Sequence, residues 1–113
     1  MKTIKTSYNT SKLDVLNAAS SIAFKDVPPT EKITVSGCAI VTEDTEDGQR
    51  DFAYIFDNEA QKVYGGNSAA AVDLLSGLIP IMEEEPGTYT VTVSCQKSKG
   101  GKDYLTFHTV FEG

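Results

Sequence analysis

The chain has 113 residues, which is enough for one domain with a single modest core and too few for two. Hydrophobic residues make up 40% of it, with five tyrosines and five phenylalanines, which excludes a disordered segment. Ten Lys and Arg residues against sixteen Asp and Glu residues give a net charge of -6, which argues against a polyanionic partner unless the positive charge is concentrated locally.

Residues 1–30 are predicted to form an N-terminal arm with one short helix. Residues 1–10 are polar and without a period, whereas Ser11 and Asp14 have the spacing of a capping box for a helix over about 11–20. The positive charge near the start is followed by no apolar run, and no stretch approaches the length of a membrane helix. We therefore expect no signal peptide and no contact with a membrane.

Residues 32–42 alternate in character and predict the first strand. Gly37 lies in its middle, where glycine often marks a bulge or a bend, and the long first strand of a small barrel must bend. An acidic turn over 43–48 ends in an Asp-Gly pair that is typical of hairpins.

Residues 50–57 predict the second strand, which has three aromatic residues on one face: Phe52, Tyr54 and Phe56. If Ala53 and Ile55 on the other face point inward, the three aromatic rings face a ligand. In the opposite orientation the aromatic rings pack in the core. Residues 62–64 predict a short third strand that ends at a pair of glycines.

Residues 69–82 have apolar side chains at helical spacing, and Asn67 or Ser68 is a suitable N-cap. Pro80 is expected to break this helix or end it early, because proline lacks an N–H group and clashes with the preceding turn.

Residues 88–111 show the clearest two-residue period of the chain and predict a β-hairpin. Its loop, residues 97–102, contains three of the ten basic residues, and Tyr104 begins the return strand. A basic, glycine-rich loop beside an aromatic residue is unusual in an acidic protein, so this loop is the first candidate for function.

These elements together predict a mainly β protein with one domain over residues 1–113. Three strands, a helix and two further strands are the order of the OB-fold, a five-stranded barrel. We expect an OB-fold-like barrel over 31–113, with the helix between the third and fourth strands and the short helix in the arm over 1–30. A plain α+β sheet packed on one helix is the alternative.

The sequence offers little for catalysis, so we expect no enzyme, no small-molecule substrate, no cofactor and no metal. His108 is the only histidine and has no triad partner at a suitable spacing. Cys38 and Cys95 lack neighbours at metal-ligand spacing and are expected to be buried free thiols, with a disulfide as the alternative. The glycines before the helix lack the lysine of a phosphate-binding loop, so a turn and a helix cap explain them.

Single-stranded nucleic acid fits the remaining pattern, because such binding needs cations along a backbone and flat rings for unpaired bases. In an OB-fold the ligand lies on strands two and three, between the loops that join strands one to two and four to five. The candidate residues for DNA binding are Arg50, Tyr54, Lys62, Tyr64, Lys97, Lys99, Lys102 and Tyr104. The acidic turn over 43–48 opposes this hypothesis, because it repels phosphates.

The chain also resembles a known class of proteins. The resemblance rests on residues 33–37, 47–48, 52–55, 63–68 and 96–105. In these segments the chain is similar to small single-stranded DNA-binding proteins of bacteriophages and mobile elements of Gram-positive bacteria. The resemblance implies a cytoplasmic protein that coats single-stranded DNA during replication in a bacterial host. Unlike the familiar bacterial single-strand-binding family, this chain has no tryptophan and no extended acidic tail.

Two other classes of function stay open. An acidic inhibitor that imitates DNA would bind a nuclease or another DNA-binding enzyme, and would not bind DNA itself. It would present its two acidic clusters as one exposed array: Glu43, Asp44, Glu46, Asp47, Glu83, Glu84 and Glu85. An assembly module would instead form a homo-oligomer through a sheet edge.

Overall fold

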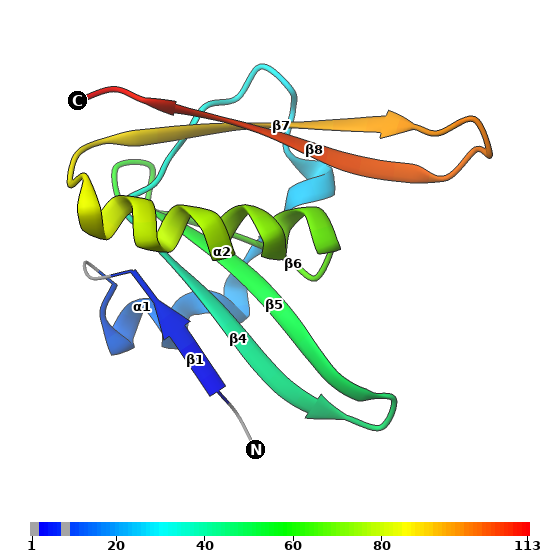
Figure 1. Ribbon diagram of the computed structural model, residues 1–113, viewed down its shortest axis with the longest axis horizontal. Helices are drawn as coiled ribbons and strands as arrows, with labels where there is room; N and C mark the ends of the chain where they lie inside the picture. Colours follow the sequence, from blue (N-terminus) through cyan, green and yellow to red (C-terminus); the bar gives the residue numbers. More distant parts are fainter. Residues whose placement is uncertain (1–2, 8–9) are drawn as a thin grey trace.

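Two sheets and two α-helices make up the mainly β fold in a computed structural model, which describes residues 3–7 and 10–113 (Figure 1). The five-stranded sheet has the order β1 (Thr3–Thr6), β4 (Gly37–Thr45), β5 (Gly48–Asp57), β6 (Lys62–Gly66) and β2 (Ile22–Ala23). The three-stranded sheet has the order β3 (Ile33–Thr34), β7 (Tyr89–Lys97) and β8 (Asp103–Phe111). The helices are α1 (Lys12–Asn17) and α2 (Ala69–Glu84), with 3-10 turns η1 (Ala18–Ser20) and η2 (Phe24–Asp26).

The chain passes from one sheet to the other at two consecutive residues. Val35 donates its N–H to the carbonyl of Tyr89 in β7, and Ser36 donates its N–H to the carbonyl of Phe56 in β5, both at 2.8 Å. Gly37 follows at once, and a β-carbon there would overlap the Thr10 hydroxyl oxygen. The expected first strand is thus divided into β3 and β4, and the bend lies at Ser36, one residue before the predicted Gly37, which begins β4.

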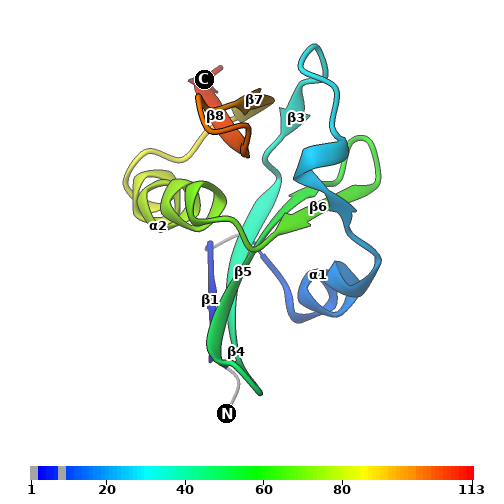
Figure 2. The same cartoon turned by 90° about the vertical axis from the view of Figure 1, so that its right-hand side faces the viewer.

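Helix α2 lies beside this crossing, in the angle between the two sheets (Figure 2). Its buried residues Leu75, Ile79 and Met82 join one core with Ile55 of the five-stranded sheet and Val91 of the three-stranded sheet. Burial of such side chains contributes about 1.5–3 kcal/mol each. A smaller core on the opposite face of the five-stranded sheet contains Ala18, Ala39 and Phe56.

The N-terminal region is more regular than its sequence predicts. Residues 3–6 form β1, paired antiparallel with residues 39–42 of β4, whereas a lead-in without structure was expected. The backbone of an edge strand can pair with a neighbour whatever the side-chain period, so no alternation was needed. The predicted helix over 11–20 is confirmed as α1 followed by η1, and Ser11 and Asp14 form the expected capping box. Residues 1–2 and 8–9 of the arm lie outside the described residues.

Pro80 lies inside α2, and the prediction that it breaks the helix is wrong. Both Pro80 and Ser76, whose carbonyl would otherwise accept the missing hydrogen bond, are exposed. Water can therefore replace the bond on the solvent side of the helix, which continues to Glu84.

The two sheets do not close into a barrel in the described part of the chain. Strand β6 pairs with β5 and β2, and β8 pairs only with β7, so an opening remains between β6 and β8. Of the helices in the described ranges, none is both long and apolar enough to cross a bilayer.

Candidate nucleic-acid interface

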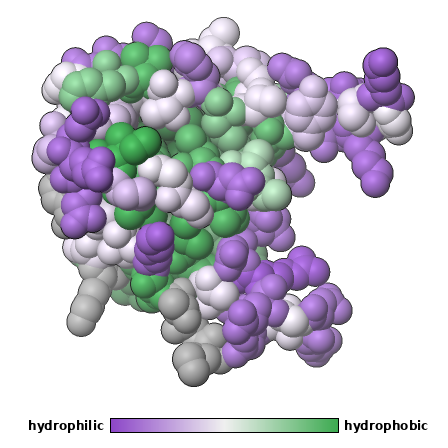
Figure 3. Space-filling view, viewed as in Figure 1, coloured by the Kyte–Doolittle hydropathy of each residue, from purple (hydrophilic) through white to green (hydrophobic). Residues whose placement is uncertain are grey.

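Two long hairpins, β4–β5 and β7–β8, project toward the same side of the molecule (Figure 1). Their tips form two hydrophilic arms with a hollow between them (Figure 3). The N-terminal end of α2 points toward this hollow in Figure 1. The cleft is this hollow between the β4–β5 and β7–β8 hairpins, with the N-terminal end of α2 at its base.

The tip of β7–β8 brings together three of the predicted cations. Lys97, Lys99 and Lys102 are all exposed there. The loop is closed by two backbone hydrogen bonds, from Ser98 N–H to Lys102 O at 2.8 Å and from Gly101 N–H to Ser98 O at 2.9 Å. Gly101 has a φ of 80°, a conformation that glycine adopts without strain. The turn chemistry therefore fixes a loop that keeps its lysines in solvent.

The tip of β4–β5 carries the opposite charge. Glu46 and Asp47 are exposed at its turn, and Arg50 forms an ion pair with Asp47 at 3.4 Å. Arg50 is also paired across the two strands with Glu43. Carboxylates therefore offset the charge of Arg50, which also lines a cavity at the cleft.

Two cavities form the base of the cleft. One, of about 330 Å³, lies in the opening between β6 and β8. It is lined by Lys25, Gly66, Asn67, Ser68, Cys95 and Tyr104 among others. The other, of about 450 Å³, is lined by Arg50, Asp51, Asn67, Ala69, Val72 and Asp73. Asn67 contributes to both, so the two cavities are neighbours at the start of α2.

The first turn of α2 gives this base a partial positive charge. Ser68 caps the helix by accepting a hydrogen bond from Ala71 N–H at 3.2 Å, as the sequence predicts. The aligned peptide dipoles place about half a positive charge at such a helix end, which favours anions.

Tyr104 is the predicted aromatic residue that lies at the cleft. The residue is 44% exposed and lines the cavity between β6 and β8. Its hydroxyl donates to Gln96 Oε1 at 3.0 Å across the hairpin, which holds the ring in one orientation. The exposed ring is available for the stacking of a planar group.

Tyr54 lies on the other face of the five-stranded sheet, and it lines neither cavity. Ala53 and Ile55 are fully buried toward α2, so the aromatic residues of β5 do point away from the main core. Phe56, however, is covered by the smaller core, and Tyr54 is half-buried against it. Burial, with Glu43 nearby, raises the pKa of the Tyr54 hydroxyl.

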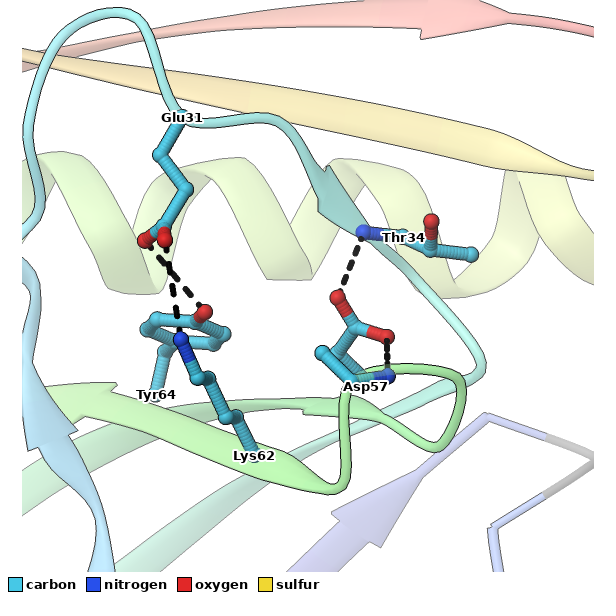
Figure 4. Close-up of polar contacts among 6 residues, drawn as sticks. Glu31, Thr34, Asp57, Lys62 and Tyr64 are labelled. Atoms are coloured by element: carbon cyan, nitrogen blue, oxygen red, sulfur yellow. Dashed lines mark hydrogen bonds and ion pairs between the residues drawn. The ribbon is translucent and has the colours of Figure 1, made fainter.

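Tyr64 is only 1% exposed and packs in the main core, so it has no free face on which a base could stack. Its hydroxyl donates to Glu31 Oε2 at 3.4 Å (Figure 4). Burial raises its pKa to about 12, with the negative charges of Glu31 and Asp57 acting in the same direction. Tyr64 is therefore removed from the set of stacking residues.

Lys62 forms an ion pair with the same Glu31, Nζ to Oε1 at 3.6 Å (Figure 4). It begins β6, whereas the cleft lies at the Gly66 end of that strand. The structure thus groups Lys97, Lys99, Lys102 and Tyr104, places Arg50 across the cleft, and leaves Tyr54, Lys62 and Tyr64 outside it.

Sequence reasoning missed Lys25, which lines the cavity beside Tyr104. It lies in η2, a short turn whose sequence has no period, and only the packing of Phe24 against Gly66 and Phe107 brings η2 to this position. No local signal marks Lys25 as a candidate.

The two cysteines are free, and they differ in environment. Cys38 is buried as predicted, and burial raises its pKa to about 11 against the opposing effect of a hydrogen bond from Ser7. Cys95 is exposed, contrary to the prediction, because β7 extends beyond the core into the projecting hairpin.

Within residues 3–7 and 10–113, no three side chains of His, Cys, Asp or Glu are grouped so that they could hold a metal ion. Comparisons with known protein families, curated proteins and solved structures find no match to this chain.

Proposed function

We propose that this protein binds single-stranded DNA without sequence specificity, in the cleft between the two hairpins. The observation that carries the proposal is the grouping of three exposed lysines with an exposed, fixed tyrosine beside a cavity and a helix N-terminus. Cations for phosphates and a ring for bases are the two components that such binding needs.

The arrangement supports one path for the strand. The phosphates follow Lys97, Lys99 and Lys102 toward the first turn of α2, and a base stacks on Tyr104. The carboxylates of Asp51 and Asp73, on the other side of the cleft, repel the backbone and keep it near the lysines. One stacked base contributes about 1–3 kcal/mol.

An open variant of the OB-fold is the architecture that we propose for this function. The crossing strand supports it, because β3 pairs with β7 while β4 pairs with β5, and α2 joins β6 to β7. In this interpretation the cleft lies between the loops that close around ligands in OB-folds. The resemblance noted above suggests a role in the replication of a bacteriophage or mobile element in the bacterial cytoplasm.

The test is a salt titration of labelled oligo-dT binding, followed by fluorescence anisotropy. Lys97→Ala/Lys99→Ala is compared with Lys5→Ala/Lys32→Ala, which removes two exposed lysines elsewhere on the surface. We expect the hairpin variant to bind more weakly and its log-log salt slope to fall by about 0.7 per lost phosphate contact. The control variant should keep the wild-type slope. Absence of binding at low salt, or equal slopes in both variants, would contradict the proposal.

The acidic tip of β4–β5 favours a second candidate, an inhibitor that imitates DNA. Glu46 and Asp47 project into solvent there, but Glu83, Glu84 and Glu85 lie at the C-terminal end of α2, away from the cleft (Figure 1). The two acidic clusters therefore do not form the single array that this candidate requires. The same titration separates the candidates, because the inhibitor would not bind DNA at any salt concentration.

A further inference from the structure

The outer edge of β8 carries backbone groups that no strand pairs with in the described part of the chain. Glu112 N–H donates to Thr88 O at 2.7 Å, and Ser98 N–H donates to Lys102 O at 2.8 Å. Because hydrogen-bonded pairs alternate along an antiparallel ladder, the even-numbered residues of β8 bond to β7. The odd-numbered residues, among them Phe107 and Thr109, direct their N–H and C=O groups toward the outer edge.

This edge lacks the usual features that prevent strand addition. Residues 103–111 contain no proline, lysine or glycine. Beside the edge, between β8 and α2, lies a groove of about 360 Å³ lined by Leu74, Leu78, Ile81, Tyr89, Thr109 and Phe111 among others. Ile81 is 46% exposed and Phe111 is 51% exposed, and apolar surface is visible over this part of the molecule in Figure 3.

One polar group in the groove has no partner. The Thr109 hydroxyl oxygen is buried and forms no hydrogen bond with the described residues. The groove wall beside Thr109 is well packed, because the Phe111 ring contacts the Tyr89 ring with ring centroids 4.9 Å apart. The groove thus offers backbone groups and apolar walls along the same line, and its lining includes one buried hydroxyl without a hydrogen bond to the described residues.

Charge at one end of the groove indicates what kind of segment fits. Glu83, Glu84, Glu85 and Glu112 are all exposed around the end where α2 stops. Neither α2 nor β8 contains a lysine or arginine to neutralise them. The C-terminal end of a helix adds a partial negative charge, so a cation is favoured here.

We propose that this groove binds an extended peptide segment of a partner protein, which adds to the outer edge of β8 as a further strand. The segment has apolar side chains at alternate positions, which enter the groove between β8 and α2, and a lysine or arginine next to Glu83, Glu84 and Glu85. Strand addition of this kind draws its affinity from main-chain hydrogen bonds and its specificity from alternate side chains. The groove lies at the opposite end of β8 from the lysine loop.

The experiment is selection from a phage-displayed library of random dodecapeptides against the full chain. Selected peptides are then labelled and titrated against the wild type, Ile81→Asp and Leu13→Asp. Leu13 is a matched control, because it is an apolar residue 64% exposed on α1. We expect peptides with alternating apolar residues and a basic residue at one end. Ile81→Asp should lower the affinity for these peptides about tenfold or more, which is typical of a residue at the centre of an interface. Leu13→Asp should leave the affinity unchanged.

Two further measurements keep the test decisive if Ile81→Asp folds poorly. Methylation of alternate peptide nitrogens should abolish binding in one register and leave it in the other, since only one set faces β8. Glu83→Gln/Glu84→Gln should weaken a basic peptide several-fold. The proposal is overturned by a selection without enrichment, by binding that Ile81→Asp leaves unchanged, or by binding insensitive to both methylation registers. Sedimentation that shows self-association lost in Ile81→Asp would also overturn it, in favour of a second copy as the occupant.

Discussion

At the scale of single residues, burial separates side chains that the sequence presents as equivalent. Cys38 and Cys95 both lie within predicted strands, yet Cys38 is fully buried and Cys95 is exposed. The thiolate is the reactive form of cysteine, and burial raises the pKa of Cys38 to about 11. The two thiols should therefore differ in reactivity.

We expect one thiol of the native protein to react rapidly with Ellman's reagent near pH 8, and the other to react only when the protein unfolds. Cys95→Ser should remove the fast reaction, and Cys38→Ala should leave it. Rapid reaction of both thiols in the folded protein would contradict the burial of Cys38.

For the tyrosines too, the sequence alone does not show which side chains are buried. The alternation in β5 correctly predicts two faces, but it cannot say that α1 and η1 cover one of them. Strand β6 has five residues, too few for its period to show that Tyr64 points into the core. Tyr104 could be predicted at the cleft because the glycine-rich loop next to it fixes the end of its hairpin.

At the scale of elements, the capping box of α1, the N-cap and apolar face of α2, and both hairpins could be predicted, because each has a local chemical signal. Strands β1 and β2 could not, since each is a short edge strand held by backbone pairing. The closure of the barrel also failed as a prediction, because strand order does not determine whether β6 reaches β8.

Asp57 connects elements that are distant in the sequence. This residue is 4% exposed at the end of β5, and its carboxylate accepts hydrogen bonds from Thr34 N–H at 3.1 Å and Ala60 N–H at 3.0 Å (Figure 4). It thus joins β3 of the three-stranded sheet to the turn that follows β5 in the five-stranded sheet.

We expect Asp57→Ala to lower the free energy of unfolding by about 1–3 kcal/mol or more, because it leaves two backbone donors unsatisfied. Asp57→Asn should cost less, since its amide keeps one acceptor oxygen. Urea unfolding of the three proteins measures the difference. Equal stability of Asp57→Ala and the wild type would show that these hydrogen bonds contribute nothing.

At the scale of the whole molecule, the distribution of charge matters more than its sum. Neutralising the acidic hairpin with Glu46→Gln/Asp47→Asn should raise the affinity for oligo-dT at low salt, because it reduces repulsion across the cleft and frees Arg50 from Asp47. The gain should shrink near physiological salt. Glu83→Gln/Glu84→Gln makes the same change in net charge at a distant site and should have the smaller effect. Equal gains from both variants would mean that only net charge matters.

The two oppositely charged hairpins have a consequence for how the molecule meets a polyanion. Together they give the protein a permanent electric dipole, although its net charge is -6. The molecule measures 39 × 36 × 25 Å, several times the screening distance of about 8 Å at physiological ionic strength. An approaching polyanion therefore responds to the nearest pole, and electrostatic attraction favours encounters in which the lysine hairpin arrives first.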